Sequence, residues 1–411
     1  MSVTASRGTG RRPRLLVMNQ YYWPGVEATA HLLSQLCEAL SDEFEITVVT
    51  GMLWGVESEA GVSERNGVRI VRVKSTSYDR SKLVPRAVNY STYLAQSFRQ
   101  ALLADRPDAV VCMTDPPVIA DIALVVARRF RVPVVVISQD VFPEIAVALK
   151  RLESPLLIGL LRVFVRFYLS RADRIVAIGE TMRTRLVEKG APADRVRVIP
   201  NWTDPTKIEP LPQDNAWSRE QRFSGRFVVM HSGNVGHAQN LDALVRSTTF
   251  LRDLDGLDVA IIGTGARHDA LLTLAEALEA DKVQFLPYQS REVLSQSLSA
   301  AAVHVVGLAS GLAGYVVPSR LYGILAAARP VIVAAEARSE TAQLVERVGC
   351  GVVVPPGRPE LLAAAIRDAH DGIYDLEAMG RRGRDWVVAE GGRELAVSRY
   401  RELLHEVTGS A

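Results

Sequence analysis

One arginine in the second half of the chain stands where a helix is predicted to begin. Gly307, Gly311 and Gly314 interrupt a stretch that carries no Asp, Glu, Lys or Arg. Pro318–Ser319 then favour the start of a helix at which Arg320 projects. The free N–H groups of a helix start and a guanidinium both attract negative charge. The pattern therefore predicts a contact between Arg320 and a diphosphate, and the plainer alternative is an ordinary surface arginine.

A second glycine-containing loop, SGNVGHAQNLD over residues 232–242, follows an expected strand. Gly233 and Gly236 stand where a backbone could approach a ligand closely, because glycine has no side chain to hold the ligand away. The polar side chains of the loop are Asn234, His237 and Gln239. We expect them to contact the same ligand.

Two further turns are less specific. GTGARHD begins with Gly263 and Gly265, which could equally face a ligand or only permit a tight turn. The loop NQYYWPGVEATA over residues 19–30 bends at Pro24–Gly25 and leads into a helix whose N–H groups would favour an anion. An ordinary turn explains that loop as well. The chain has neither a Walker sequence nor a complete GxGxxG, which argues against a nucleotide triphosphatase or a dehydrogenase.

In the first half, the expected strand VPVVVIS runs into QDVFPE, residues 139–144. Asp140 therefore follows the carboxyl end of a strand, the edge at which open α/β sheets bind ligands. Its carboxylate could orient a hydroxyl or accept a proton. The alternative is a helix N-cap, a position that Asp often occupies.

Short β-branched runs alternate with helical patterns along the whole chain. One series of expected strands runs from Arg14 to Ile199 and a second from Phe227 to Val354, a rhythm typical of buried parallel sheets. Four prolines interrupt both periodicities between residues 200 and 217. We therefore expect an α/β protein with two doubly wound, Rossmann-like domains facing a cleft. The expected limits are a loose tail over 1–12, a first domain over 13–200, a linker over 201–217, a second domain over 218–385 and a C-terminal helix over 386–411.

Composition limits the class of protein. Of 411 residues, 48% are apolar and 23% charged, which excludes a disordered or low-complexity chain. Lys and Arg number 48 against 46 Asp and Glu, a balance that argues against a nucleic-acid binder, whose affinity comes from neutralising phosphates. Cys37, Cys112 and Cys350 lie far apart without metal-ligand spacing, and indicate buried, reduced thiols. The N-terminus lacks the apolar core of a signal peptide, so we expect a cytoplasmic protein.

Residues 155–172, PLLIGLLRVFVRFYLSRA, combine apolar residues with Arg162, Arg166 and Arg171. Such a helix could lie on an anionic bilayer surface. Burial against the sheet of the first domain explains the apolar residues as well. The arginines interrupt the run well short of about 20 residues, so we do not expect it to span a membrane.

Several of these segments together resemble a known family. SGNVGHAQNLD, GTGARHD, VQFLPYQSREVL, VVPSRLYGILAAARPVIV and CGVVVPPGRPELLAAAI occur in an order that resembles the retaining, GT-B-fold glycosyltransferases of family 4. QDVFPE and VIPNW are similar to the WbuB-like and colanic-acid-type subgroup, which makes bacterial surface polysaccharides. The resemblance covers residues 14 to about 390.

The resemblance implies that the second domain binds a nucleotide-diphosphate sugar and the first domain binds the acceptor. It implies transfer with retained anomeric configuration and no catalytic metal or other cofactor. Asp140 matches an acceptor-side catalytic or sugar-orienting position, and Arg320 would stabilise the departing diphosphate. The residues that we expect to bind the donor are Gly25, Gly233, Asn234, His237, Gln239, Gly263, Gly265, Ser319, Leu321 and Tyr322.

The chain departs from the family pattern at two places. Many relatives carry two glutamates eight positions apart, where this sequence has Tyr315 and Gly323. Many also carry Arg and Lys at the positions of Asn234 and Gln239. Arg320 would then supply more of the charge compensation, with help from His237.

The resemblance implies transfer of a hexosyl or N-acetylhexosaminyl unit, most simply from a UDP-sugar, in cell-surface polysaccharide synthesis. The acceptor would be a saccharide or a polyprenyl-diphosphate-linked saccharide, and the enzyme would work in the cytoplasm at the inner face of the membrane. Two alternatives stay open on the sequence. One is a hydrolysing sugar-nucleotide epimerase of the same architecture, and the other is a sugar-nucleotide-binding partner without catalysis.

Overall fold

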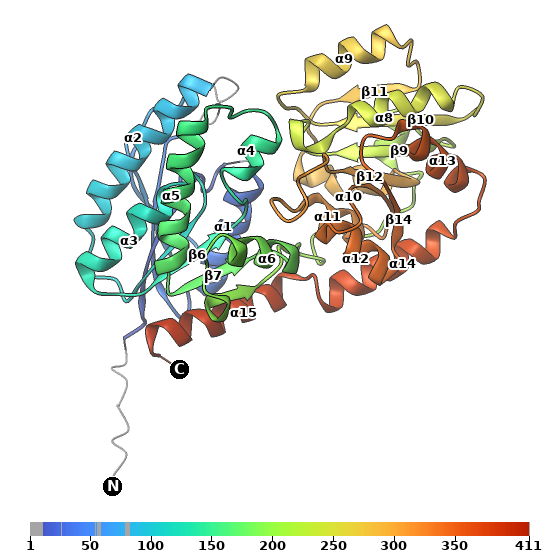
Figure 1. Cartoon of the computed structure of the whole chain (residues 1–411). Coiled ribbons are helices and arrows are strands. Elements are labelled where there is room, and N and C mark those ends of the chain that lie inside the picture. The colour runs from blue at the N-terminus through green and yellow to red at the C-terminus, as the bar shows by residue number, and fades with distance from the viewer. Residues whose placement is uncertain (1–10, 26, 54, 56–58, 79–82, 411) are drawn as a thin grey trace.

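The computed structural model describes residues 11–25, 27–53, 55, 59–78 and 83–410. Most of the tail expected over residues 1–12 lies outside the described residues. The chain forms two sheets flanked by helices, and the two halves lie side by side in Figure 1. The prediction of an α/β protein with two doubly wound, Rossmann-like halves is confirmed.

The first sheet has eight strands in the order β3-β4-β2-β1-β5-β6-β7-β8. Its strands are β1 (Arg14–Met18), β2 (Glu45–Thr50), β3 (Gly61–Arg65), β4 (Val68–Arg72), β5 (Ala109–Met113), β6 (Val134–Ser138), β7 (Arg174–Ala177) and β8 (Val196–Val198). Its helices are α1 (Ala28–Leu40), α2 (Leu83–Leu102), α3 (Ile119–Phe130), α4 (Glu144–Ala148), α5 (Pro155–Arg171) and α6 (Glu180–Glu188). Every residue of β5 and β6 is buried, because helices cover both faces of the sheet.

Strand β3 was not expected from the sequence. It pairs antiparallel with β4 at the sheet edge, and four of its five residues are exposed. Asn66 and Gly67, both at positive φ, connect the two strands. An Asn-Gly turn between two strands is a strong hairpin signal, so this dipeptide could have revealed β3.

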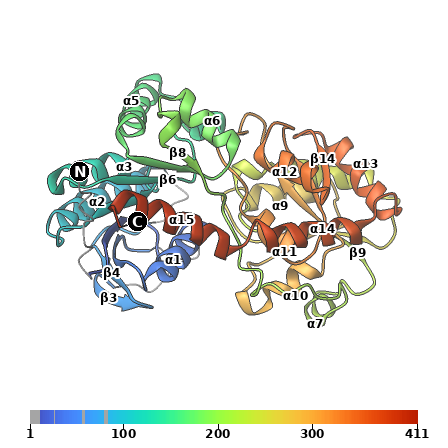
Figure 2. The ribbon, with the colours of Figure 1, turned by 90° about the horizontal axis from the view of Figure 1, so that it is seen from below.

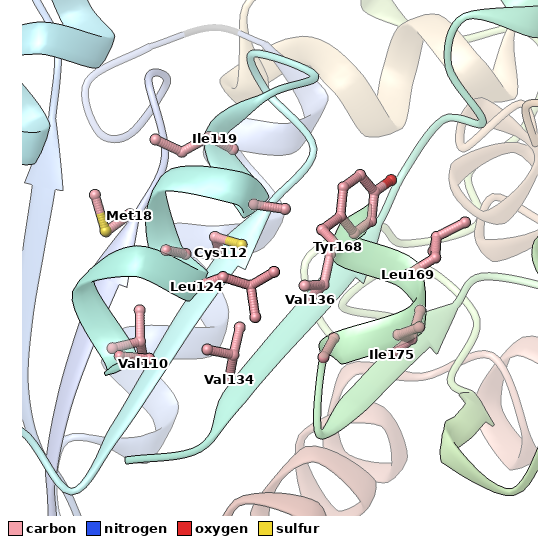
Figure 3. Close-up of a cluster of buried hydrophobic side chains, with 14 of the residues drawn as sticks. Met18, Val110, Cys112, Ile119, Leu124, Val134, Val136, Tyr168, Leu169 and Ile175 are labelled. Carbon is pink, nitrogen blue, oxygen red and sulfur yellow. The ribbon is translucent and has the colours of Figure 1, made fainter. Parts of the chain in front are cut away.

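The core of the first half lies on both faces of the sheet. Alternate residues of β5 and β6 meet α3 and α5, with Leu124, Tyr168 and Leu169 between them, as Figure 3 shows. The intervening residues, such as Val111 and Val135, pack on the opposite face. This alternation follows from the two-residue period of a strand.

The second sheet has six strands in the order β11-β10-β9-β12-β13-β14, all paired in parallel. Its strands are β9 (Phe227–Ser232), β10 (Leu257–Ile262), β11 (Val283–Leu286), β12 (Val303–Gly307), β13 (Val331–Ala334) and β14 (Gly351–Val354). Its helices are α7 (Ala216–Glu220), α8 (Asp242–Ser247), α9 (His268–Ala277), α10 (Leu294–Ser299), α11 (Arg320–Ala326), α12 (Glu340–Val348), α13 (Pro359–His370) and α14 (Leu376–Ala389).

The chain crosses between the halves twice. The two crossings touch, since Thr203 and Gly392 form an isolated parallel bridge. After the second crossing, α15 (Arg393–Thr408) runs along the first half (Figure 2). It buries Tyr400 and Leu403 in the same core cluster as Leu36 of α1. The last helix therefore belongs to the packing of the first half.

Candidate active site

Arg320 lies against the glycine loop that follows β9. Its Nη2 approaches the carbonyl oxygen of Asn234 at 3.4 Å. A Cβ at Gly233 would lie 3.4 Å from the guanidinium carbon of Arg320. The structure therefore brings Gly233, Asn234 and Arg320 together, although they come from segments about 90 residues apart.

His231, next to last in β9, contacts the guanidinium of Arg320. Nη1 of Arg320 hydrogen-bonds the imidazole, and lies 3.1 Å from Nδ1 and closer to Nε2. His231 is fully buried, and burial, with the charge of Arg320 added, holds its pKa far below the ordinary range. The ring is therefore neutral and can accept a hydrogen bond from the cation.

Arg320 keeps its charge in this position. Burial lowers its pKa to about 10, which still leaves the guanidinium protonated at neutral pH. No carboxylate forms an ion pair with Arg320 within the part of the chain that the structure describes. A half-buried cation whose protein partners are an imidazole and a carbonyl oxygen is suited to an anionic ligand.

The rest of the loop 232–242 is held by its own contacts. Gln239 accepts a hydrogen bond from the Gly236 N–H through Oε1 at 3.0 Å, which fixes the turn. Asn234 and His237 are exposed. Burial, and then the positive charge of Arg151 from the first half, lowers the pKa of His237. His237 is therefore near a cation of the other half of the molecule.

Gly263 and Gly265 allow a neighbouring turn to pack on this loop. A Cβ at Gly263 would lie 2.1 Å from the Gly233 carbonyl oxygen, and one at Gly265 would lie 2.3 Å from that of Val235. The Val235 N–H also donates to the Thr264 carbonyl oxygen at 2.9 Å. Both glycines are thus explained by close backbone packing, and donor contact by them stays a prediction.

Helix α11 begins at Arg320, with Ser319 as its N-cap, as the sequence predicts. It has only seven residues, so the charge of Arg320 matters more than the dipole of the helix. Leu321 and Tyr322 are buried, and their N–H groups donate to Pro318 and Ser319 at 3.3 Å. Their observed role is in packing, and their expected donor contact is untested.

Asp140 lies at the contact between the two halves. It forms an isolated bridge with Val316, and the Val141 N–H donates to the Tyr315 carbonyl oxygen at 2.9 Å. Val316 lies four residues before Arg320 in the sequence. The structure therefore places Asp140 beside the segment that carries Arg320, with Asp140 itself half-buried.

Gly25 occupies a tight turn of the first half. Its N–H donates to the Tyr22 carbonyl oxygen at 2.9 Å, and a Cβ there would lie 2.5 Å from Glu27 Oε2. The Glu27 side chain could move away, but the same Cβ would also lie 2.9 Å from the Tyr22 carbonyl oxygen, so the backbone of the turn leaves little room for a side chain. Contact of Gly25 with the donor remains an expectation.

The two positions that depart from the family pattern lie in different surroundings. The Tyr315 ring packs under the guanidinium of Arg185, 5.2 Å from its centre, and so contacts the other half of the molecule. A Cβ at Gly323 would meet only Ile208 and Leu298, at 3.7 and 3.8 Å. The protein atoms nearest to this position are therefore apolar.

Sequence reasoning missed His231. The available signal was a polar residue at the end of the apolar run FVVMHS, directly before the glycine loop. Sequence reasoning also missed the contacts of Tyr315 with Arg185 and of Glu340 with Thr181. No local pattern could have paired these residues, because each pair joins the two halves.

Two features, a metal site and a membrane-spanning helix, are absent from the described residues. No group of three or more His, Cys, Asp or Glu is placed there as a metal site requires. None of the helices that the structure describes has both the length and the apolar character needed to cross a membrane.

Two family models match the chain, one in each half. The model described as glycosyl transferase 4-like domain matches residues 25–202, and the one described as glycosyl transferases group 1 matches residues 213–386. The chain is 27% identical to the glycosyltransferase WbjE of Pseudomonas aeruginosa over 89% of its length and 91% of that protein's. It is 31% identical to WcaI of Escherichia coli (strain K12), named for colanic acid biosynthesis, over 50% of its length. This second alignment spans about half of WcaI, 51% of its length.

Solved structures share the fold across almost the whole chain. Sucrose-phosphate synthase from Thermosynechococcus elongatus superposes with a TM-score of 0.80 at 17% identity, covering 97% of this chain and 100% of that one. HepE of Anabaena, in complex with UDP-glucose, gives 0.71 at 14% identity, covering 96% and 99%. The chain thus belongs to the group 1 glycosyltransferases of family 4, retaining enzymes of the GT-B fold that use nucleotide-sugar donors.

Proposed function

We propose that this enzyme transfers a hexosyl or N-acetylhexosaminyl unit from a UDP-sugar to a saccharide acceptor carried on a polyprenyl diphosphate. The relatives WcaI, named for colanic acid biosynthesis, and WbjE support a role in cell-surface polysaccharide synthesis. The structure of HepE with UDP-glucose supports UDP as the nucleotide.

The observation that carries the proposal is the contact between the positively charged guanidinium of Arg320 and the neutral ring of His231. A nucleoside diphosphate gains negative charge as its bond to the sugar breaks, and a fixed cation lowers the energy of that state. Gly233 leaves room for the phosphate beside the guanidinium, since glycine presents no side chain there. The same loop offers the exposed Asn234 and His237 to the ligand.

The proposed reaction keeps both bond changes on one face of the sugar. The bond from the anomeric carbon to the diphosphate oxygen breaks, and the acceptor oxygen bonds to the same carbon. The acceptor proton passes to the departing diphosphate, so no further reactant is needed. Asp140, beside the segment 315–320, orients the reacting sugar by accepting hydrogen bonds from its hydroxyls.

A lipid-linked acceptor requires the enzyme to reach a bilayer, and α5 offers a surface for that. Only Val165, Tyr168 and Leu169 of α5 are buried, whereas Leu156 is 85% exposed and Val163 64%. Arg162, on the same helix, is exposed as well. Exposed apolar side chains among arginines match an anionic membrane surface. The enzyme would then act in the cytoplasm, at the inner face of the membrane.

Nucleotide binding and turnover test the proposal separately. A thermal-shift series with UDP, GDP, ADP and dTDP should favour UDP, because a ligand at about 100 times its dissociation constant stabilises by about 2.7 kcal/mol. Release of UDP from UDP-sugars should then require a membrane extract that contains the acceptor. Equal shifts with all four nucleotides would contradict the choice of UDP, and absence of turnover with every sugar nucleotide would contradict the transfer.

A further inference from the structure

The side chain of Gln20, shortly after β1, is buried with an amide that no protein group satisfies. Gln20 is only 2% exposed, and its Oε1 atom is closed off from solvent without a hydrogen-bond partner in the described structure. Among the described residues, the Nε2 atom of the same amide has no partner either. Most buried polar groups in folded proteins are hydrogen-bonded, and one without a protein partner indicates a bound ligand or water.

Gly51, which follows β2, brings two further side chains to Gln20. A Cβ at Gly51 would lie 3.3 Å from Gln20 Cγ and 3.1 Å from Ser75 Oγ. The Gly51 carbonyl oxygen accepts a hydrogen bond from Arg72 Nη1 at 2.7 Å. Ser75 Oγ accepts from the Met52 N–H at 3.0 Å, and a hydroxyl that accepts can still donate its own hydrogen. Gln20, Arg72 and Ser75 therefore meet around Gly51, and we call these three residues the edge group.

Arg72, the last residue of β4, is a cation without a carboxylate partner. It is only 8% exposed, and it forms no ion pair within the part of the chain that the structure describes. Its Nη1 and Nη2 atoms donate to the carbonyl oxygens of Gly51 and Trp23, at 2.7 and 2.6 Å. Burial lowers the pKa of Arg72, but a guanidinium stays protonated in proteins. Carbonyl oxygens carry no net charge, so a counter-charge for Arg72 has to come from a ligand.

The edge group lies at the same edge of the first sheet as Asp140. Strands β4, β2, β1, β5 and β6 pair in parallel in this order. Arg72 ends β4, Gly51 follows β2, and Gln20 and Asp140 each stand two residues after the end of β1 and β6. Open α/β sheets bind ligands at this edge. The edge group is therefore on the ligand-binding side of the half that we expect to bind the acceptor.

We propose that the edge group binds an acidic group of the acceptor, a carboxylate or a phosphate. Arg72 holds one oxygen of this anion, and the Gln20 amide and the Ser75 hydroxyl bind neighbouring oxygens. Under the proposed function, on which this inference rests, the anion has two possible sources. One is the carboxylate of an acidic sugar in the acceptor saccharide, and the other is the diphosphate of its lipid carrier. An uncharged acceptor would leave Arg72 without a counter-charge.

Two soluble probes distinguish these sources without turnover. Calorimetry on the full chain measures the binding of glucuronate and of inorganic pyrophosphate, with saturating UDP present to occupy the site at Arg320. At least one probe should bind about tenfold or more tightly than uncharged glucose. Tighter binding of glucuronate indicates an acidic sugar, and tighter binding of pyrophosphate indicates the carrier diphosphate. If neither probe binds more tightly than glucose, the site is overturned.

Variants of the edge group separate ligand binding from folding. Gln20→Met keeps the length of the side chain without its amide, and Arg72→Lys keeps the charge without the planar fork. Each variant should bind the preferred probe about tenfold more weakly. Because Gln20→Met removes a buried polar group that has no protein partner, it should melt no lower than the wild type. Arg69→Lys makes the matched change at an exposed position of β4 and should bind like the wild type.

The outcomes are distinct. Wild-type affinity in both Gln20→Met and Arg72→Lys would overturn the site. A lower melting temperature of Gln20→Met with unchanged affinity would also overturn it, since the amide would then serve folding alone. Absence of transfer activity would instead overturn the proposed function, and the measured binding of the probes would stand.

Discussion

Glu340 of the second half accepts two hydrogen bonds from Thr181 of the first half, from the backbone N–H at 3.1 Å and from Oγ1 at 3.2 Å. Thr181 lies in the first turn of α6, where backbone N–H groups lack partners within the helix. A carboxylate from one half thus completes a helix start of the other. Gly179 permits this approach, since a Cβ there would lie 2.5 Å from Glu340 Cδ.

Removal of this contact should loosen the junction between the halves. Glu340→Ala leaves the Thr181 N–H without its partner and should lower the free energy of unfolding by about 1 to 3 kcal/mol. Thermal unfolding measures the change. Glu346→Ala, at an exposed position of the same helix, is the matched control. Equal melting temperatures of the two variants would rule out a stabilising role for the contact.

Replacement of Arg320 should act on turnover more than on folding. Arg320→Ala removes the cation that faces the departing diphosphate and should reduce kcat by about 100-fold or more. His231→Phe keeps the ring shape but loses the acceptor for the guanidinium, so kcat should fall by a smaller factor, about tenfold. Steady-state release of UDP measures both, with Arg246→Ala, at an exposed position of α8, as the control. Turnover of Arg320→Ala close to the wild-type value would exclude the assigned role.

Helix α5 should control attachment to membranes. Leu156→Ser combined with Val163→Ser removes two exposed apolar side chains and should weaken binding to anionic vesicles at least about tenfold. Co-sedimentation with vesicles at low salt measures this. Ile373→Ser with Val388→Ser makes the matched change at exposed positions of the second half, 70% and 58% exposed in the wild type. If the two double variants sediment alike, α5 does not contact the bilayer.

The strand pattern and the loops after the strands were readable from the sequence, because buried parallel strands have continuous apolar runs and ligand loops follow their carboxyl ends. Gly233, Asn234 and Arg320 were predicted in this way, and they lie together. The partner of Arg320 was not predictable, since the contact with His231 depends on how β9 and α11 pack. Whether Gly263 serves packing or faces a ligand also depends on how segments distant in sequence pack, so the sequence alone left both possibilities.

Features that depend on contacts between segments far apart in the sequence were still harder to predict. Helix α15 returns to the first half because Tyr400 fits into a core built by α1 and the first sheet. The helical period of the α15 sequence indicates only that one face is apolar. The apolar residues of α5 were equally compatible with core and surface. The structure shows that few residues of α5 are buried. The periodicity of the sequence did not indicate this.

Asp121 provides a stability test with a defined pH dependence. Both of its carboxylate oxygens are buried without hydrogen-bond partners in the described structure, and burial raises the pKa of Asp121 to about 7. The unfolded chain releases this proton near its ordinary value of 3.8. Between these values the folded state binds more protons than the unfolded state, so stability falls as the pH rises.

Asp121→Asn removes the charge at nearly constant size. The variant should match the wild type near pH 4 and exceed it above pH 7, by about 1 to 3 kcal/mol once partial exposure is allowed for. Urea unfolding at pH 5 and pH 8 measures the difference. Asp269→Asn, at an exposed position of α9, should show no comparable trend. A constant difference between Asp121→Asn and the wild type across this range would mean that the carboxyl group is not protonated in the folded enzyme, and that a cation or a bound ligand balances its charge.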